Sequence, residues 1–221
     1  MCGRFVLATP VPTIAQRFKA KQVFPFDPGP RYNIAPTNDV IMVKEEGVRQ
    51  LIPCRWGLIP VWAKDPAIGS SMINARAETV ADKPAFRHAL KKQRCLVIAD
   101  GFYEWRKEGG RKPPMYIRLA SAEPFGFAGL YTVWASPTGD EVCTCAIITT
   151  TANALLKPIH DRMPVIMPRV REDQWLDPSL QTREELLPLL EPYDGDAMEA
   201  WEVSPRMNRP AYDSPDNITP I

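Results

Sequence analysis

The sequence contains 221 residues, of which 27 are Lys or Arg and 26 are Asp or Glu, so its formal net charge is only +1. So small a charge argues against a protein that coats duplex DNA by bulk electrostatic attraction, although a local basic groove is compatible with it. No stretch approaches the roughly 18 consecutive apolar residues of a membrane span. The chain also lacks the charged and apolar regions that open a secretion signal, so we expect a cytoplasmic protein without membrane contact.

Proline and cysteine usage are the informative parts of the composition. The 24 prolines are about twice the usual share of about 5%, which favours many short, stiffly connected elements over long helices. The cysteines are odd in number and lack the spacing of a disulfide framework, so free thiols in a reducing cytosol are the simplest interpretation. They are Cys2, Cys54, Cys95, Cys143 and Cys145.

Short elements separated by loops are predicted for the first half of the chain. In chain order they are a strand at residues 3–7, a helix at 13–19, an ordered proline-rich loop at 24–36, a hairpin of strands at 39–43 and 48–54, and a helix from 82 to about 91. Ile14 and Phe18 lie four residues apart on one face of the first helix. Asp82 is expected to cap the second helix, with Pro84 tolerated in its first turn.

Strands dominate the second half. They are predicted at residues 95–99, 102–107, 115–119, 125–134, 142–150 and 200–203, with a short helix at 170–176 and another from 182 through 190. A Gly109-Gly110 turn should pair the second and third of these strands, and Thr182 with Glu185 forms a capping box. We therefore expect one α+β domain over residues 1–221, with an antiparallel, barrel-like sheet as its core and short peripheral helices.

Cys2 is the first candidate functional residue. Removal of Met1, expected before a small residue, would leave a cysteine with both a thiol and a free α-amine. The usual pKa values of these groups, roughly 8.5 and roughly 8, leave both partly deprotonated near neutral pH. The amine can condense with an aldehyde to an imine, and the thiol can then close a thiazolidine ring, which an internal cysteine cannot do. The alternative is a terminal cysteine without a chemical role.

Two further residues are candidates for proton transfer. His160, one of only 2 histidines, is flanked by an aspartate and an arginine between two prolines. A histidine titrates near neutral pH and can act as general acid or base, but a structural histidine that bonds the backbone of a turn is the alternative. Glu104 lies among aromatic and apolar residues, where desolvation would raise its pKa, unless it faces outward from its strand.

The segment from Asn74 to Glu78 combines amide, guanidinium and carboxylate groups, with Arg76 at its centre. Such groups suit phosphate or amide recognition, and equally a solvated turn. Cys143 and Cys145 should face the same side of a strand, but no second pair or spaced histidines accompany them. We therefore expect no metal and, because no glycine-rich phosphate loop is present, no nucleotide cofactor.

Six short motifs are spread along essentially the whole chain. They are Met-Cys-Gly-Arg-Phe at 1–5, Arg-Tyr-Asn-Ile-Ala-Pro at 31–36, Trp-Gly-Leu-Ile-Pro at 56–60, Ile-Asn-Ala-Arg-Ala-Glu-Thr at 73–79, Asp-Gly-Phe-Tyr-Glu-Trp at 100–105 and Ile-His-Asp-Arg-Met-Pro at 159–164. Each motif alone is weak, but their combination in this order is highly specific. Together they resemble the SRAP family, the SOS response-associated peptidase proteins that shield abasic sites in DNA.

This resemblance implies a monomer that binds single-stranded DNA without a cofactor and forms a thiazolidine crosslink with the ring-opened aldehyde of an abasic site. Cys2 would be the crosslinking residue, and Asn74 would orient the sugar and the N-terminus. Glu104 would manage protons near the amine, while His160 would act on the deoxyribose ring oxygen and on the imine. The family also implies a peptidase activity that removes Met1, a lyase activity, and association with the nucleoid when damaged DNA is bound.

Six residues are predicted to contact DNA. Arginines beside the proposed chemical residues could neutralise phosphates around the lesion, while an asparagine and two tryptophans could offer polar contacts and stacking surfaces. They are Arg4, Asn33, Trp62, Arg76, Trp105 and Arg162. Their local concentration would reconcile strand binding with the small net charge.

Two other classes of function remain open. An N-terminal-nucleophile amidohydrolase of the glutamine amidotransferase type also begins Met-Cys-Gly and would use the Cys2 thiol as nucleophile, with the α-amine as base. That hypothesis gives no role to Glu104 or to the segment around His160. A non-catalytic module for nucleic-acid binding would leave Cys2 incidental.

Overall fold

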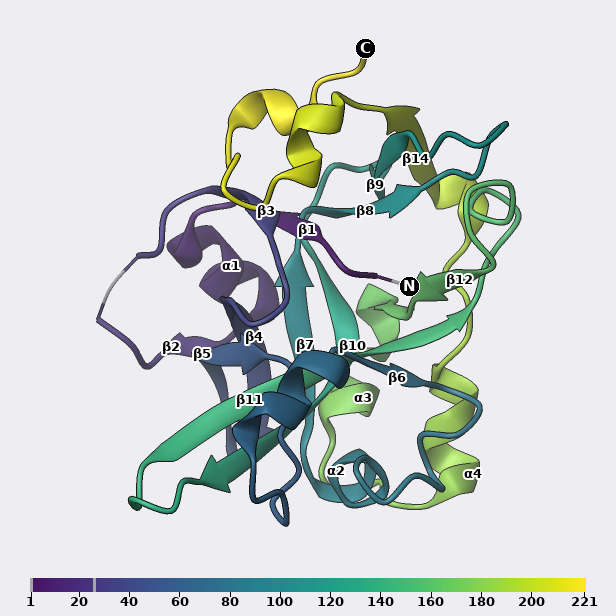
Figure 1. Ribbon diagram of the computed structural model, residues 1–221. Coiled ribbons are helices and arrows are strands. Elements are labelled where there is room, and N and C mark those ends of the chain that lie inside the picture. Colours follow the sequence, from purple (N-terminus) through teal and green to yellow (C-terminus); the bar gives the residue numbers. More distant parts are fainter. Residues whose placement is uncertain (1, 26) are drawn as a thin grey trace.

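Within residues 2–25 and 27–221, which the computed structural model describes, five strands close into a barrel (Figure 1). They are β4 (Asp39–Glu46), β5 (Val48–Trp56), β7 (Arg94–Ala99), β10 (Phe125–Ala135) and β11 (Glu141–Thr151). Neighbours in the order β5–β4–β7–β10–β11 are antiparallel. The ring closes where β5 and β11 pair in parallel, with Thr144 opposite Arg55 and Cys145 opposite Trp56.

The strand β7 shows why the barrel forms. Its run of apolar residues is buried throughout, as expected for a strand that is covered on both faces. Helix α3 (Glu172–Leu176) packs against it, and the Trp175 indole donates a 2.9 Å hydrogen bond to the carbonyl oxygen of Cys95. The same helix is tied to α1 (Val11–Phe18) by a 2.8 Å ion pair between Glu172 and Arg17. Buried aromatic and charged groups thus fix the helices against the barrel.

A second antiparallel sheet carries the N-terminal segment. Its strands, in spatial order, are β14 (Met198–Glu202), β9 (Pro114–Leu119), β8 (Gly101–Trp105), β1 (Phe5–Leu7) and β3 (Arg31–Ile34). This sheet lies above the barrel in Figure 1. The Phe5 ring of β1 packs against the rings of Trp56 and Phe127 in the barrel, at centroid distances of 5.1 and 5.9 Å. The two sheets therefore share one apolar core.

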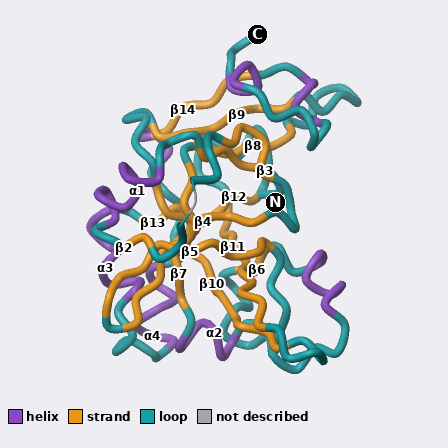
Figure 2. Tube along the Cα trace, turned by 90° about the vertical axis from the view of Figure 1, so that its left-hand side faces the viewer, coloured by secondary structure: helices purple, strands orange, loops and turns teal. Residues whose placement is uncertain are grey.

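Short elements complete the fold. The remaining strands are β2 (Lys21–Gln22) beside β5, β6 (Asn74–Arg76) and β12 (Arg162–Pro164) beside β11, and β13 (Ile166–Met167) beside β10. The other helices are α2 (Arg87–Lys92) and α4 (Arg183–Leu186). Figure 2 shows the helices at the periphery of the strands. None of the helices in the described part of the chain combines the length and apolar character needed to cross a membrane.

These observations confirm the predicted α+β class, with a barrel-like core and short peripheral helices. The hairpin of β8 and β9 is confirmed, and both glycines of its turn adopt positive φ, 52° at Gly109 and 85° at Gly110. Glycine tolerates this backbone conformation because it lacks a Cβ atom. The capping box is also confirmed, since the Thr182 hydroxyl and the Glu185 carboxylate each bind the other's backbone N–H.

Three predicted elements are wrong in extent. The loop predicted at 24–36 contains β3, because the edge of β1 provides a pairing partner that no local pattern reveals. The helix predicted from Asp82 begins only at Arg87, since Asp82 binds Arg183 at 2.7 Å and the chain before α2 forms hydrogen-bonded turns. The helix predicted to reach residue 190 ends at Leu186 and continues as a 3-10 turn that contains Pro188.

Candidate functional site

Cys2 lies just before β1 and is completely buried, with 0% of its surface exposed. Burial raises the pKa of its thiol, and the negative charge of Glu104 raises that pKa further. A hydrogen bond from the backbone N–H of Arg4 opposes this effect but does not cancel it. In the chain that still carries Met1, a dry site beside a carboxylate therefore favours the protonated thiol.

Asn74 holds the backbone of Cys2. Its Nδ2 atom donates a 2.8 Å hydrogen bond to the Cys2 carbonyl oxygen. Asn74 is placed by β6, which pairs in parallel with β11 so that Asn74 lies opposite Ile147. The Asn74 Oδ1 atom is buried and has no hydrogen-bond partner among the described residues. The site therefore retains one buried acceptor next to the N-terminal segment.

Glu104 is brought to the same place by β8. This strand pairs with β1, and the Tyr103 N–H donates a 2.9 Å hydrogen bond to the Arg4 carbonyl oxygen. Glu104 is only 2% exposed, which contradicts the alternative of an outward-facing strand residue. Its negative charge raises the pKa of the Cys2 thiol, so the two groups lie within electrostatic range of each other. Cys2 just before β1, Asn74 in β6 and Glu104 in β8 thus form one cluster.

His160 lies in the turn that precedes β12. Its backbone N–H donates to the Leu156 carbonyl oxygen at 2.8 Å, and its Nδ1 atom accepts the Arg162 backbone N–H at 2.9 Å. Asp161 Oδ1 also lies 2.9 Å from Nδ1, so a second proton on the ring would gain a carboxylate partner. In the neutral ring, the bond from Arg162 places the proton on Nε2.

The positions of β6 and β12 relate His160 to the cluster. Asn74 in β6 lies opposite Ile147, and Arg162 in β12 lies opposite Thr151, so both strands flank the same end of β11. The described N-terminal segment lies beside β12 in both views of the molecule (Figures 1 and 2). The fold therefore places all four predicted chemical residues around this end of the barrel.

Arg4 and Asn33, both predicted to contact DNA, are used inside the fold. Arg4 Nη1 donates to Asn33 Oδ1 at 2.7 Å and to the Met207 carbonyl oxygen at 3.1 Å. Asn33 is 1% exposed, and its Nδ2 atom donates to the carbonyl oxygens of Met207, Arg209 and Tyr212. These side chains fasten the C-terminal segment to β1 and β3. Sequence reasoning missed this role because its partners are separated by more than 170 positions along the chain.

Arg76 and Arg162, which lie near Asn74 and His160 in the sequence, differ in whether their side chains are free to bind a ligand. Arg162 donates to Glu78 Oε2 at 3.0 Å and to the Thr149 carbonyl oxygen at 2.6 Å, and its hydrogen bonding holds the pKa of Glu78 below its usual value. Arg76 is exposed, and its side chain makes no hydrogen bond or ion pair within the described part of the chain. Arg76 is therefore better placed than Arg162 to bind a phosphate.

The two predicted stacking residues also differ. Trp62 is 57% exposed, at the tip of a loop that Trp134 fixes through a 2.8 Å hydrogen bond to the Ala63 carbonyl oxygen. Trp105 is half-buried, and its indole donates to Asn208 Oδ1 at 2.7 Å. An exposed ring on a fixed loop offers a face for stacking, whereas Trp105 has only part of its surface available.

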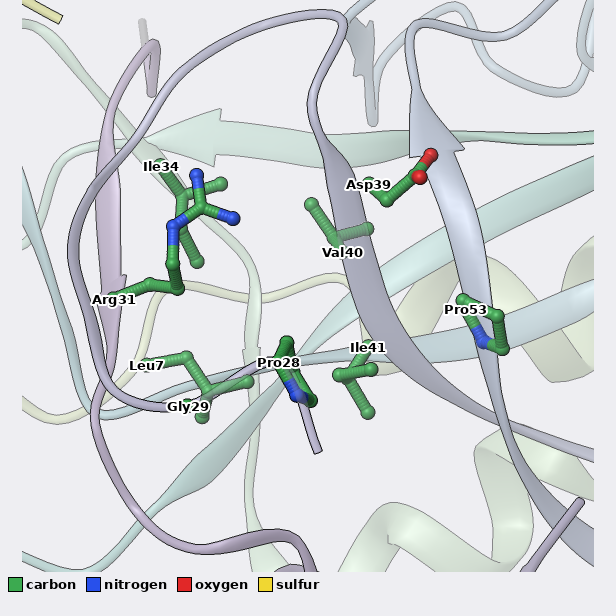
Figure 3. Close-up of a pocket in the computed structure, with 9 residues that line it drawn as sticks. All are labelled: Leu7, Pro28, Gly29, Arg31, Ile34, Asp39, Val40, Ile41 and Pro53. Carbon is green, nitrogen blue, oxygen red and sulfur yellow. The ribbon is translucent and has the colours of Figure 1, made fainter. Parts of the chain in front are cut away.

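A hollow of about 180 Å³ lies away from these residues (Figure 3). Apolar side chains that include Leu7, Ile34 and Val40 line it, with Arg31 and Asp39 as its charged members. None of the ten predicted site residues lines this hollow. The cluster around Cys2 is thus distinct from the hollow shown in Figure 3.

The fold and the site define the class of the protein: an α+β barrel with a buried cysteine next to its N-terminus, bound by an asparagine and adjacent to a buried glutamate. The chain belongs to the SOS response associated peptidase (SRAP) family, whose model matches residues 1–210. It is 46% identical over 221 residues to the abasic site processing protein YoqW of Bacillus subtilis (strain 168), with 99% of each chain covered.

Two more distant comparisons agree with this assignment. The chain is 32% identical over 191 residues to the abasic site processing protein YedK of Escherichia coli (strain K12), with 83% of each chain covered. A crystal structure of a protein from Bacteroides thetaiotaomicron superposes with a TM-score of 0.89 at 30% identity, covering 100% of both chains. The similarity therefore extends over the whole fold, including the strands that carry the site.

Proposed function

We propose that this protein processes abasic sites in DNA by forming a covalent crosslink with them through Cys2. The observation that carries the proposal is the position of Cys2, whose carbonyl is bound by Asn74 and whose thiol is buried beside Glu104. The relatives in B. subtilis and E. coli are abasic site processing proteins, which supports the same class of substrate.

The first bond forms at the α-amine that Met1 removal exposes. An unprotonated amine adds to the C1′ aldehyde of the ring-opened sugar, and loss of one water molecule leaves an imine. Because an α-amine has a pKa of roughly 8, it is mostly protonated at neutral pH and needs a base. We assign that role to Glu104, whose carboxylate lies beside Cys2. Asn74 Oδ1, the buried acceptor next to Cys2, is suited to bind and orient the amine.

The thiol forms the second bond. Burial beside the negative charge of Glu104 raises the pKa of the thiol, which favours attack by the amine before attack by sulfur. The Sγ atom then bonds to the imine carbon, the thiol proton leaves, and the former imine nitrogen gains a proton. We assign Glu104, whose charge acts on the Cys2 thiol, to relay this proton. The product is a five-membered thiazolidine that joins Cys2 to C1′.

His160 is assigned to the opening of the sugar. The cyclic hemiacetal opens when its C1′ hydroxyl loses a proton and the ring oxygen gains one. We assign the imidazolium form of His160 as the acid, with its Nδ1 proton held by Asp161 and its Nε2 proton donated to the ring oxygen. The neutral imidazole left by this transfer accepts the hydroxyl proton at Nε2, so the imidazolium is regenerated.

Two exposed side chains, those of Arg76 and Trp62, suit the binding of single-stranded DNA. The exposed Arg76 can bind a phosphate, and the exposed face of Trp62 can stack on a base that has no partner strand. Arg162, Arg4 and Asn33 would act mainly by holding this surface together, because their polar groups already bind protein atoms. We infer that a monomer is sufficient for binding.

Met1 removal is the step that makes the amine available. Hydrolysis of the Met1–Cys2 peptide bond consumes one water molecule, and either the protein itself or a separate aminopeptidase can catalyse it. Intact mass measurement of protein translated in a purified system without aminopeptidase distinguishes these routes. Loss of Met1 there supports the peptidase activity, while retention assigns the step to a separate enzyme.

The proposal is tested with purified protein and single-stranded DNA that contains one abasic site. The natural protein should give a heat-stable adduct without a reducing agent. Cys2→Ser retains the amine but cannot close a thiazolidine, so its adduct should require trapping with borohydride, and strand cleavage by β-elimination from the imine should increase. Cys95→Ser, which alters another completely buried thiol, is the matched control and should crosslink normally.

Three outcomes separate the hypotheses. A stable adduct that depends on Cys2 supports the crosslink. Ammonia release from glutamine without an adduct would instead support the amidohydrolase. Binding of the DNA with neither reaction would support a non-catalytic module. Equal adduct yield from natural protein and Cys2→Ser would contradict the proposed chemistry.

A further inference from the structure

A second group of thiols lies inside the barrel, separate from Cys2. Cys54 is on β5, Cys95 on β7, and Cys143 and Cys145 on β11. Among the described residues, no set of three or more histidine, cysteine or carboxylate side chains has an arrangement that could hold a metal ion. The chemistry of this group is therefore that of the thiols themselves.

Cys54 and Cys143 are in direct contact. Their Sγ atoms are 2.9 Å apart, as the partners of a thiol–thiol hydrogen bond. They lie on the two strands that close the barrel, one residue before the pair Arg55–Thr144. Neighbouring strands are roughly 4.8 Å apart, and disulfides join Cα atoms about 4.4–6.8 Å apart. Continuation of the strand pairing by one residue would therefore give the spacing that a disulfide requires.

The two thiols differ in access and acidity. Cys143 is half-buried, whereas Cys54 is 2% exposed. The hydrogen bond with Cys54 holds the pKa of Cys143 below its usual value, and the positive charge of Lys44 acts in the same direction, opposed by burial and by Glu46. Burial raises the pKa of Cys54. Cys143 is thus the accessible nucleophile, and Cys54 is the protonated neighbour that can react second.

We propose that Cys54 and Cys143 form a reversible disulfide when the protein meets a hydroperoxide. The Cys143 thiolate attacks the distal peroxide oxygen, the O–O bond breaks, and the released alkoxide or hydroxide takes up a proton. This two-electron step leaves a sulfenic acid on Cys143. The Cys54 sulfur then attacks the Cys143 sulfur, the S–OH bond breaks, and the Cys54 proton leaves with the hydroxide as water.

The disulfide would connect β5 and β11, the two strands whose pairing closes the barrel. β5 and β11 form the parallel pair of the ring, and β11 also carries β6, the strand of Asn74. A crosslink between residues 54 and 143 closes a long loop, which restricts the unfolded chain and stabilises the folded one. Oxidised protein should therefore melt several degrees higher than reduced protein. A dithiol reductant should reverse the change.

The test uses the full chain with hydrogen peroxide as the oxidant, followed by alkylation of the remaining thiols and peptide mapping. We expect a peptide pair joined between Cys54 and Cys143, lighter by two hydrogen atoms than the separate peptides, and lost after dithiothreitol. Cys95→Ser, which keeps the pair, should still form it. Cys54→Ser and Cys143→Ser should each abolish both the crosslinked peptide and the oxidative rise in Tm.

Other results would overturn the proposal. Examples are a crosslink between Cys54 and Cys145, a sulfinic acid on Cys143 without a crosslink, or no oxidation of either thiol at peroxide levels that modify free cysteine. If a serine variant fails to fold, mapping of the natural protein still decides the question. That mapping depends only on the pair itself and not on crosslinking to DNA.

Discussion

Asn74→Ala is expected to slow crosslinking to an abasic site far more than it weakens DNA binding. The substitution removes the 2.8 Å hydrogen bond from Nδ2 to the Cys2 carbonyl oxygen, and with it the buried Oδ1 acceptor beside the N-terminus. Leaving a partly buried carbonyl without its donor costs about 1–3 kcal/mol. If that energy positions the amine in the transition state, the rate should fall by roughly 5- to 150-fold.

The assay is the single-turnover rate of heat-stable adduct formation at saturating single-stranded DNA. Binding is measured separately with a non-reactive abasic analogue that lacks the C1′ hydroxyl. Asn74→Asp is the second variant, because its carboxylate has nearly the same shape but cannot donate to the carbonyl oxygen when ionised. It should be at least as slow as Asn74→Ala.

Gln22→Ala is the matched control. Its amide also donates a 2.8 Å hydrogen bond to a backbone carbonyl oxygen, that of Phe24, but from strand β2, which lies beside β5. We expect a comparable loss of thermal stability from Gln22→Ala and Asn74→Ala, but slower crosslinking only from the latter. Equal rates in the two variants would refute the positioning role and leave Asn74 as a stabilising residue.

Three further predictions concern the fold and the DNA surface. Gly57→Ala should lower the free energy of unfolding by about 2–4 kcal/mol, because φ at Gly57 is 133° and a Cβ atom would lie 2.7 Å from a backbone oxygen. At Gly47, φ is 75° and no heavy atom other than those of Gly47 and its chain neighbours lies within 4 Å of an added Cβ atom. Gly47→Ala should therefore lower the free energy of unfolding, measured in denaturant melts, by only about 1 kcal/mol. Hydrogen bonding to Arg162 lowers the pKa of Glu78 in the folded state. Ionised Glu78 therefore stabilises the fold fully at pH values above its unfolded pKa of about 4.3, and this stabilisation is lost as the pH falls through the lower pKa of the folded state. The Tm gap between natural protein and Glu78→Gln should therefore shrink on acidification, and a constant gap would contradict the pairing. Trp62→Ala should leave Tm unchanged and weaken single-stranded DNA binding by about 1–3 kcal/mol in anisotropy titrations if one base stacks on the ring.

Part of the fold could be predicted from the sequence because its strands are marked by local signals. The run at Arg94–Ala99 in the barrel is buried throughout, and the turn at Gly109-Gly110 marks the hairpin of β8 and β9 in the second sheet. Strands β6 and β12 could not be predicted in this way. Each has three residues, so neither shows a recognisable alternation, and each is a strand because β11 provides a pairing edge.

The candidate site residues could be identified from the sequence, but the structural surroundings of their side chains could not. Nothing near Cys2 in the sequence indicates that Glu104 would raise the pKa of its thiol, since the two meet only when β1 pairs with β8. The same limit explains Arg4 and Asn33, which look like exposed polar residues and are instead bound to the C-terminal segment. Local sequence reports residue chemistry, whereas long-range pairing decides whether that chemistry is buried or available.

Cys2 lies next to the chain terminus, and the fold keeps this terminal segment ordered. Chain termini usually fray, and a frayed terminus would have to be ordered each time it reacts. Here the terminal segment is fastened at successive residues: Asn74 binds the Cys2 carbonyl, the Arg4 carbonyl accepts the Tyr103 N–H, and the Arg4 side chain binds Asn33. One step further along, the Phe5 ring is packed in the barrel core. Because folding has already ordered this segment, little further entropy would be lost in the proposed reaction of the amine and thiol with an aldehyde. That accounts for the use of hydrogen-bonding groups from three separate parts of the chain to hold its first residues.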